Sequence, residues 1–446
     1  MTNRVQMPLW VVVAAVLSHP LLSASGFELE QVGCFAPGAL HADVLLSGDG
    51  RTLVFSASAD LVPGENPLGI PQLFALDLES RTTRQITPAL MGTQRDAELC
   101  RATRATVSSD GQRMIAVATC GVAPEETRWR LFEYRGGETR ALGRWTRCAP
   151  TVRPQALAAD GRRLAITAAC DPLHARVAKR PPRNWLWLQR RPGAPLRRSG
   201  PPGCEMLAPA LDTADGPLAF LSTCDPRGEN RSGAMNLFVQ ERRGSRPRQL
   251  THAVYGGAGG KCGALQFTDA VRTGLFEPPT LAPAGPLLFA APCLDERDVG
   301  SALVHRLWRF SRETWRPEEI PLPACNIPEA DALRVVTSPV AASRGAERIA
   351  LVRSCARVGD VREGEQALVV LREGAPPLTL LANQGYQVLV HREIRRPALD
   401  EAGTLLATIS AEPPPGCAGA ETPQLVIARD LDDPVLRRVT CGCGPA

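Results

Sequence analysis

The sequence predicts an all-β fold, a seven-bladed β-propeller with about four antiparallel strands per blade. A short turn followed by an apolar strand recurs seven times, and a second apolar strand follows each turn at a similar distance. No long stretch has the 3.6-residue apolar period of an amphipathic helix. Repeats of about 60 residues with four short strands each are typical of propeller blades.

The first 25 residues have the pattern of a secretory signal peptide. Arg4 supplies a basic start, residues 7–17 form an apolar run, and small residues at 23–25 offer cleavage before Gly26 or Phe27. The alternative is an uncleaved membrane anchor, but a histidine and a proline interrupt the apolar run. We therefore expect an exported protein, periplasmic or secreted, with no membrane span after cleavage.

One propeller can take up the rest of the chain, although 446 residues would allow two or three domains by length alone. Each turn contains Asp-Gly or a remnant of it, and Asp-Gly between apolar runs favours a hairpin because a tight turn needs positive φ. The turn-and-strand copies lie at 47–55, 108–117, 159–166, 214–221, 284–289, 345–352 and 402–407. The expected blades of this single domain, residues 26–446, are roughly 38–90, 100–144, 148–200, 204–252, 277–323, 333–382 and 390–441.

The second apolar strand of each repeat begins with leucine and a large or branched side chain. Its copies are Leu73-Phe74, Leu131-Phe132, Leu186-Trp187, Leu237-Phe238, Leu307-Trp308, Leu368-Val369 and Leu425-Val426. A further short strand follows a few residues later, often beside arginines, as at 84–87 and 248–251. Apolar residues at regular strand positions are mostly buried, so we expect these pairs to fill the core between blades.

The first blade carries the fullest set of motifs. The residues 47–51 (SGDGR) are followed by 54–56 (VFS), 59–64 (ADLVPG), 72–74 (QLF) and 77–78 (DL). This order resembles the TolB-type propeller repeat, also called the WD40-like PD40 repeat. Later blades keep the turn and the leucine-led strand, but blades five to seven lack Asp-Gly. The resemblance implies a propeller for nearly all of the mature chain. It does not imply a role in Tol-Pal transport, because TolB's additional N-terminal domain is not expected before the first repeat.

Fourteen cysteines in an exported chain favour disulfides, and ten of them follow the repeat. In five blades one cysteine precedes the turn and another lies 9 or 10 residues after it. We predict five bridges from the start of a blade to the end of its second strand: Cys100–Cys120, Cys148–Cys170, Cys204–Cys224, Cys262–Cys293 and Cys325–Cys355. Each closed loop contributes about 3 kcal/mol by the chain-entropy estimate.

The other four cysteines, Cys34, Cys417, Cys441 and Cys443, lie at the two ends of the repeat array. A propeller has to close its ring between the first and last blades. A bridge from Cys34 to Cys441 or Cys443 would hold this closure, with Cys417 bonded to the other, and the sequence leaves the pairing open. The alternative for residues 441–443 (CGC) is a metal or redox site, but no CxxC pair or histidine cluster accompanies it.

Sequence motifs of known chemistry are missing. There is no Gly-x-Ser-x-Gly nucleophile turn and no His-Glu-x-x-His zinc motif. The stretch 256–261 lacks the first glycine of a phosphate-binding loop, and Cys262 follows it where Ser or Thr would bind magnesium, so we interpret it as a loop. The net charge of +5 comes almost entirely from arginines interspersed with acidic residues, which argues against nucleic-acid binding. We predict no catalytic residue, no cofactor and no metal ligand.

Several residue types have two interpretations. Aspartates recur after the second strands and could bind calcium or cap turns, and turns are favoured because two of them precede proline. These residues are Asp60, Asp171, Asp225 and Asp295. The scattered histidines could meet on one face as a metal site; they are His41, His174, His252, His305 and His391. Trp129, Trp185 and Trp308 flank the long loops, either as anchors for a partner or as core.

The expected function is non-catalytic: a monomeric scaffold that binds a protein or an envelope glycan through one propeller face, where loops on a rigid ring carry recognition. The alternative is an enzyme, of polysaccharide lyase or hydrolase type, with its site at the central channel. An enzyme would bring ionisable residues of several blades within hydrogen-bond reach. A scaffold would instead expose an apolar or aromatic patch on a rim.

Overall fold

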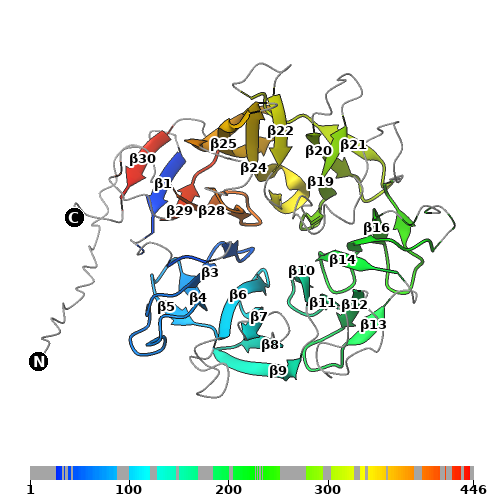
Figure 1. Ribbon diagram of the computed structural model, residues 1–446, viewed down its shortest axis with the longest axis horizontal. Helices are drawn as coiled ribbons and strands as arrows, with labels where there is room; N and C mark the ends of the chain where they lie inside the picture. The colour runs from blue at the N-terminus through cyan, green and yellow to red at the C-terminus, as the bar shows by residue number, and fades with distance from the viewer. Residues whose placement is uncertain are drawn as a thin grey trace, which may run out of the picture.

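The repeats form seven β-sheets around one axis, so the predicted fold class, a seven-bladed β-propeller, is confirmed (Figure 1). The structure is a computed structural model. It describes residues 27–32, 35, 39–41, 44–87, 100–120, 128–146, 150–168, 184–199, 204–226, 228, 230, 233, 235–251, 278–294, 303–325, 332–336, 340–357, 360–385, 394–411, 417, 424–432 and 436–441.

Blades 1 to 5 are four-stranded antiparallel sheets whose strands follow chain order from the axis outward. Blade 1 contains β2 (Leu45–Leu46), β3 (Thr52–Ala57), β4 (Gln72–Asp77) and β5 (Thr83–Gln85). Blade 2 contains β6 (Cys100–Val107), β7 (Arg113–Cys120), β8 (Arg128–Arg135) and β9 (Glu138–Thr146). Blade 3 contains β10 (Pro150–Leu157), β11 (Leu164–Ala168), β12 (Trp185–Gln189) and β13 (Arg197–Ser199).

Blade 4 contains β14 (Met206–Leu211), β15 (Leu218–Ser222), β16 (Asn236–Gln240) and β17 (Arg248–Gln249). Blade 5 contains β18 (Thr280–Leu281), β19 (Leu287–Leu294), β20 (Leu303–Phe310) and β21 (Pro317–Ile320). In blade 6 the first strand is split into β22 (Ala332–Val336) and β23 (Ala341–Ala342), followed by the short 3-10 turn η3 (Arg344–Ala346), β24 (Arg348–Arg357), β25 (Asp360–Arg372) and β26 (Ala375–Gly385). Blade 7 contains β27 (Ala398–Leu399), β28 (Leu405–Ser410), β29 (Gln424–Arg429), β1 (Phe27–Gln31) and β30 (Leu436–Thr440).

The core lies between neighbouring blades, because each sheet is covered on both faces. All six residues of β3 and of β28 are buried. The leucine-led pairs expected in the core are buried throughout, such as Phe74 and Phe238, except that Trp308 is half-buried. One apolar cluster joins blades 7 and 1 and another joins blades 2 and 3. The regularly placed apolar strands of neighbouring blades therefore pack against each other and form the core.

The ring closes through the N-terminal strand β1, which lies between β29 and β30 in blade 7. It runs antiparallel to β29 and parallel to β30. Phe27 and Leu29 are buried in the core between blades 6 and 7, and Glu30 pairs with Arg81 of blade 1 at 2.6 Å. The innermost strands then contact one another in an unbroken cycle, with β27 returning to β2.

The prediction of about four antiparallel strands per blade is confirmed, and the closure adds a fifth strand and one parallel pair to blade 7. The repeat pattern places blade 7 at 390–441 and misses β1, since a strand of 5 residues far from the other copies is too short to recognise by period. The expected signal peptide at 1–25 lies outside the described residues.

Candidate functional site at the axial ends of the ring

Antiparallel blades give the ring two different axial ends. The first strand of each blade runs to the turn that joins it to the second strand, and the second strand runs back. We call the end formed by these turns, from 47–50 in blade 1 to 400–403 in blade 7, the turn end. The loop end is opposite, where the first strands begin and the loops between second and third strands lie. Of the residues singled out in the sequence, Cys100, Cys120, Asp60, Trp129 and Trp185 are examples that the structure places at the loop end.

At the turn end, backbone hydrogen bonds join the turns of neighbouring blades. Ser109 N–H donates to Ala159 O at 2.7 Å, and Glu401 N–H donates to Gly48 O at 2.8 Å. Similar bonds run from Asp49 N to Ser109 O, from Ala159 N to Asp212 O, from Arg344 N to Glu401 O and from Gly345 N to Pro283 O. At most junctions the donor lies in one blade and the acceptor in the next blade along the ring. The last bond runs from blade 6 back to blade 5, because Pro283 of blade 5 has no N–H to donate.

Blades 4 and 5 are joined at the turn end by side chains. The turn of blade 5 is one residue shorter than the others, so that Leu281 faces Leu287. Arg312 of blade 5 bridges the junction: its Nη1 lies 2.7 Å from Asp212 Oδ2 of blade 4, and its Nη2 donates to Ala282 O at 2.8 Å. Every junction between neighbouring blades is therefore bonded at this end.

Three side chains from three blades also meet at the turn end. The carboxylate of Glu401 in blade 7 reaches across Gly48 of blade 1 to blade 2, where the Ser109 hydroxyl donates to its Oε1. Its Oε2 pairs with Arg344 Nη2 of blade 6 at 2.6 Å. A Cβ on Gly48 would lie 2.5 Å from Glu401 Oε1 and 2.7 Å from Ser109 Oγ, so the glycine provides the space for this contact. We call Ser109, Arg344 and Glu401 the turn-end latch.

The turn-end latch brings a serine, a carboxylate and an arginine within hydrogen-bond reach, as an enzyme site would. Both oxygens of Glu401 are bonded inside the protein, however, and its backbone N–H and C=O both belong to the ring of turn bonds. The latch therefore acts as a tie between blades 6, 7 and 2. The latch could not be predicted from local spacing, because Ser109 and Glu401 are 292 residues apart in the sequence. Their shared place in the turn pattern is the signal that could have found them.

At the loop end, disulfides link the start of a blade to its second strand. Cys100 begins β6 and Cys120 ends β7. The two residues are paired in register on these adjacent strands and form a disulfide. The structure also pairs Cys204 with Cys224 in blade 4 and Cys325 with Cys355 in blade 6. These are three of the five pairs expected from the repeat. The other two expected pairs involve Cys148, Cys170 and Cys262, which lie outside the described residues.

A fourth disulfide joins Cys417 and Cys441 near the C-terminal end of blade 7. This is one of the two arrangements that the sequence left open for the terminal cysteines. Cys441 is thus bonded in a disulfide, which argues against the alternative of a metal or redox site at 441–443. Cys34 and Cys443 lie outside the described residues, so their expected bridge stays a prediction.

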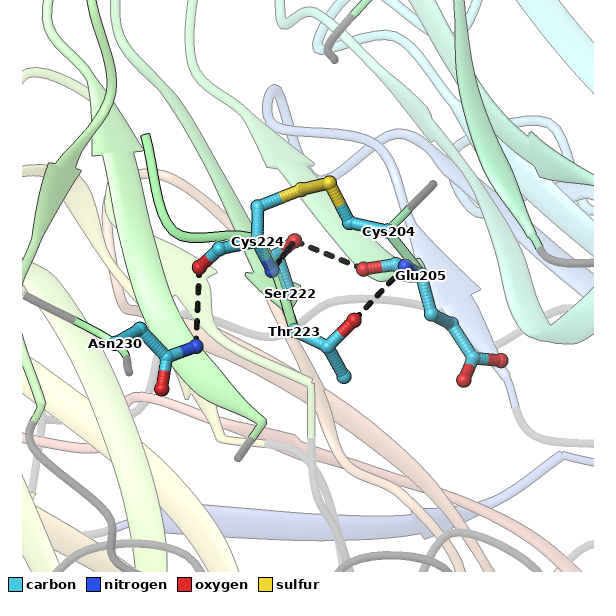
Figure 2. The surroundings of a disulfide bond; sticks show 6 residues. All are labelled: Cys204, Glu205, Ser222, Thr223, Cys224 and Asn230. Atoms are coloured by element: carbon cyan, nitrogen blue, oxygen red, sulfur yellow. Dashed lines mark hydrogen bonds between the residues drawn. A yellow bond between two sulfur atoms is a disulfide. The ribbon is translucent and has the colours of Figure 1, made fainter. Parts of the chain in front are cut away.

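Hydrogen bonds around Cys204–Cys224 extend this link into the neighbouring loop (Figure 2). Ser222 Oγ accepts from Cys224 N–H at 3.0 Å and donates to Glu205 O at 2.8 Å. Asn230 Nδ2 donates to Cys224 O at 3.0 Å, so part of the loop after β15 is fixed to the disulfide. Hydrogen bonds therefore connect Asn230, in the described part of this loop, to the disulfide of blade 4.

Two of the loop aspartates act as turn caps. Asp60 accepts hydrogen bonds from the backbone N–H groups of Gly64 and Asn66, both at 2.8 Å. Asp225 accepts from Asn230 N–H at 2.9 Å. These bonds favour the turn interpretation over calcium binding. The other two aspartates, Asp171 and Asp295, lie outside the described residues.

Three basic residues lie near the starts of the innermost strands of blades 7, 1 and 2, at the loop end. Arg395 lies just before β27, His41 lies before β2, and Arg101 is the second residue of β6. The backbone holds two of them in place, since His41 N–H donates to Ser56 O at 3.0 Å and Arg395 N–H donates to Ile409 O at 2.8 Å. Partial burial, then the charges of Arg395 and Arg101, lower the pKa of the His41 imidazole below its ordinary value. We call His41, Arg101 and Arg395 the loop-end basic cluster.

The candidate tryptophans pack between blades. Trp129 and Trp185 are half-buried against the core of blades 2 and 3, and Trp308 against the core of blades 4 and 5. The guanidinium of Arg198 lies 4.7 Å from the ring centre of Trp185. Among the described residues, the large hydrophobic side chain that is exposed is Leu68, at 47%. The described surface therefore lacks the apolar rim patch expected of a scaffold.

The part of the chain that the structure describes contains no group of three or more His, Cys, Asp or Glu residues able to hold a metal ion. The expected loop at 256–261 and three of the candidate histidines, His174, His252 and His391, lie outside that part. Within the same ranges, no helix has the length and apolar character needed to cross a membrane.

Comparison with known proteins supports the fold. No protein-family model and no curated protein matches the sequence. An oligogalacturonate lyase from Vibrio parahaemolyticus matches with a TM-score of 0.53 and 12% identity, covering 91% of this chain and 98% of its own. The chain has the propeller fold. At this identity the likeness shows the fold alone.

Two further structures match more weakly. A TolB candidate from Agrobacterium tumefaciens has a TM-score of 0.39 and 12% identity, covering 74% of this chain and 93% of its own. A puromycin-hydrolysing peptidase from Mycobacterium tuberculosis has a TM-score of 0.45 and 15% identity, covering 85% of this chain and 51% of its own. The resemblance to the TolB-type repeat stays a prediction, since no family model matches.

Proposed function

We propose that the protein is an exported, non-catalytic scaffold that binds a cell-envelope partner at its loop end. The observation that carries this proposal is the contrast between the two ends. At the turn end the charged side chains of the turn-end latch bind one another. At the loop end His41 and Arg101 are exposed beside disulfide-linked strands.

The disulfides support both parts of the proposal. They persist in oxidising compartments, which favours a location outside the cytoplasm. They also fix the loop end before a partner arrives, as in blade 4, where the loop after β15 is bonded to the Cys204–Cys224 link (Figure 2). A rigid binding surface loses less conformational entropy on association, so more of the contact energy appears as affinity.

Site-specific photo-crosslinking in intact cells tests which end binds. A benzophenone amino acid replaces Leu68, which lies in the loop between β3 and β4 at the loop end. The matched control replaces Ser80, an exposed residue in the turn between β4 and β5 at the turn end. We expect an adduct from position 68 and none from position 80. Adducts from position 80 alone, or from neither position, would refute the proposal.

A further inference from the structure

We propose that the Cys417–Cys441 disulfide is an oxidation-dependent lock on the closure of the ring, which a dithiol opens selectively. In the oxidised protein the lock holds the last strand, β30, against the N-terminal strand β1. Reduction releases β30 and leaves one side of β1 uncovered. The inference concerns how the ring closes, so it does not rest on the binding proposed for the loop end.

The first step of the argument is the position of β30, the outer edge strand of blade 7 (Figure 1). Its ladder partner among the described strands is β1, which in turn pairs with β29. The pairing of β30 with β1 is parallel, and parallel ladders are slightly less stable per residue than antiparallel ones. An edge strand held by one such ladder belongs to the part of a fold that opens locally at low cost.

The second step is the place of the disulfide. Cys441 directly follows Thr440, the last residue of β30, and Cys417 lies between β28 and β29. The covalent link therefore ties the end of β30 to the antiparallel part of blade 7 without depending on β1. The sequence separation is 24, and closing a loop of this length favours the linked state by about 100-fold on the chain-entropy estimate.

The third step is access to the sulfur atoms. A thiolate has to reach a disulfide sulfur, so exposed disulfides are the ones that are reduced readily. Cys441 is exposed, whereas Cys417 is 9% exposed, so attack is expected at Cys441. The other three described disulfides contain no exposed cysteine: Cys100, Cys120, Cys224 and Cys355 are buried, and Cys204 and Cys325 are half-buried.

The reaction is an exchange between this disulfide and a dithiol. A thiolate of the dithiol attacks Cys441 Sγ, the bond to Cys417 Sγ breaks, and the electron pair leaves on Cys417 Sγ, which takes up a proton. The second thiol of the reagent then displaces Cys441 from the mixed disulfide. Both cysteines end as thiols, and the dithiol ends as a disulfide.

The effect on the protein should be local. Phe27 and Leu29 stay buried in the core between blades 6 and 7, and Glu30 lies 2.6 Å from Arg81 and 3.6 Å from Arg429. These contacts, like the ladder to β29, do not involve β30. Reduction therefore opens β30 and the adjoining side of β1 while the rest of the ring remains folded. Full closure is then coupled to a compartment in which disulfides persist.

Reduction followed by alkylation tests the selectivity. The folded protein is treated with a low concentration of dithiothreitol, samples are alkylated at intervals, and the modified cysteines are mapped by mass spectrometry. We expect Cys417 and Cys441 to be alkylated before any cysteine of the other three described disulfides. Earlier or simultaneous alkylation in blade 2, 4 or 6 would overturn the inference.

Hydrogen exchange measured by mass spectrometry tests the lock itself. The variant is Cys417→Ala/Cys441→Ala, and the matched control is Cys204→Ala/Cys224→Ala, which opens a loop of similar length in blade 4. In the variant, amides of residues 27–31 and 436–440 should exchange about 100-fold faster than in the parent protein. The control should leave their exchange unchanged.

Unchanged exchange in both segments of the variant, or an equal acceleration in the control, would refute the lock. If the variant does not fold, the same exchange is measured on the parent protein after selective reduction by dithiothreitol. The acceleration expected there is the same, and its absence would equally refute the lock.

Discussion

Gly48→Ala is expected to destabilise the ring although the backbone at this position suits any residue. Its φ is not in the left-handed region, so alanine adds no backbone strain. The added Cβ would lie 2.5 Å from Glu401 Oε1, 2.8 Å from Glu401 Cγ and 2.7 Å from Ser109 Oγ. The Glu401 side chain therefore has to move away from Ser109.

The cost follows from the bonds that Glu401 would lose. A hydrogen bond to a charged group contributes about 1.5–3 kcal/mol, and the Glu401 side chain here is only 16% exposed. The ion pair with Arg344 adds about 0–1 kcal/mol, because the arginine side chain is 67% exposed. We therefore expect Gly48→Ala to lower the free energy of unfolding by about 2 kcal/mol.

Urea unfolding followed by tryptophan fluorescence measures this change, and a double-mutant cycle assigns its cause. In a Glu401→Ala background the contacts with Glu401 are gone and Ser109 Oγ, no longer bonded to Glu401, can rotate away from the added Cβ, so Gly48→Ala should cost less than about 0.5 kcal/mol. An equal cost in both backgrounds would show that the latch is not what the glycine accommodates. A negligible effect of Glu401→Ala itself would show that the latch does not hold the ring together.

Leu29→Ala in the closing strand β1 should lower the free energy of unfolding by about 2–5 kcal/mol, because Leu29 is 1% exposed. The surface control Ser80→Ala should change this free energy by less than about 0.5 kcal/mol in the same urea assay. A loss for Leu29→Ala as small as that for Ser80→Ala would contradict a role for β1 in stability. Replacing Cys204 and Cys224 together by alanine opens a link with a sequence separation of 20, so calorimetry should show a loss of about 3 kcal/mol; no loss would mean that the bridge does not stabilise blade 4. Arg101→Gln should raise the pKa of the His41 imidazole, which burial and then the charges of Arg395 and Arg101 lower below its ordinary value of 6.5, because one of the two positive charges that disfavour imidazolium is removed. NMR titration of His41 in both proteins measures this change, and an unchanged pKa would exclude Arg101 as one of its causes.

Much of the fold could be predicted because its blades are local in sequence. Each turn such as 47–50 lies between two strands that pair with each other, so the Asp-Gly pattern and the apolar strands identify a sheet directly. The same locality places Cys100 opposite Cys120. The candidate site was less predictable, since its residues come from different blades: no spacing in the sequence connects Arg395 with His41 and Arg101.

The sequence by itself determined the number of blades, the position of each turn and which cysteines share a blade, because period and local pairing are properties of the chain. Tertiary structure decided how the ring closes, since β1 can pair with β29 and β30 only where the folded ring brings the N-terminal segment beside blade 7. It also decided that Glu401 reaches Ser109 across Gly48, and that β27 of blade 7 contacts β2 of blade 1. These contacts depend on the circular arrangement of the blades, which places residues from opposite ends of the chain side by side.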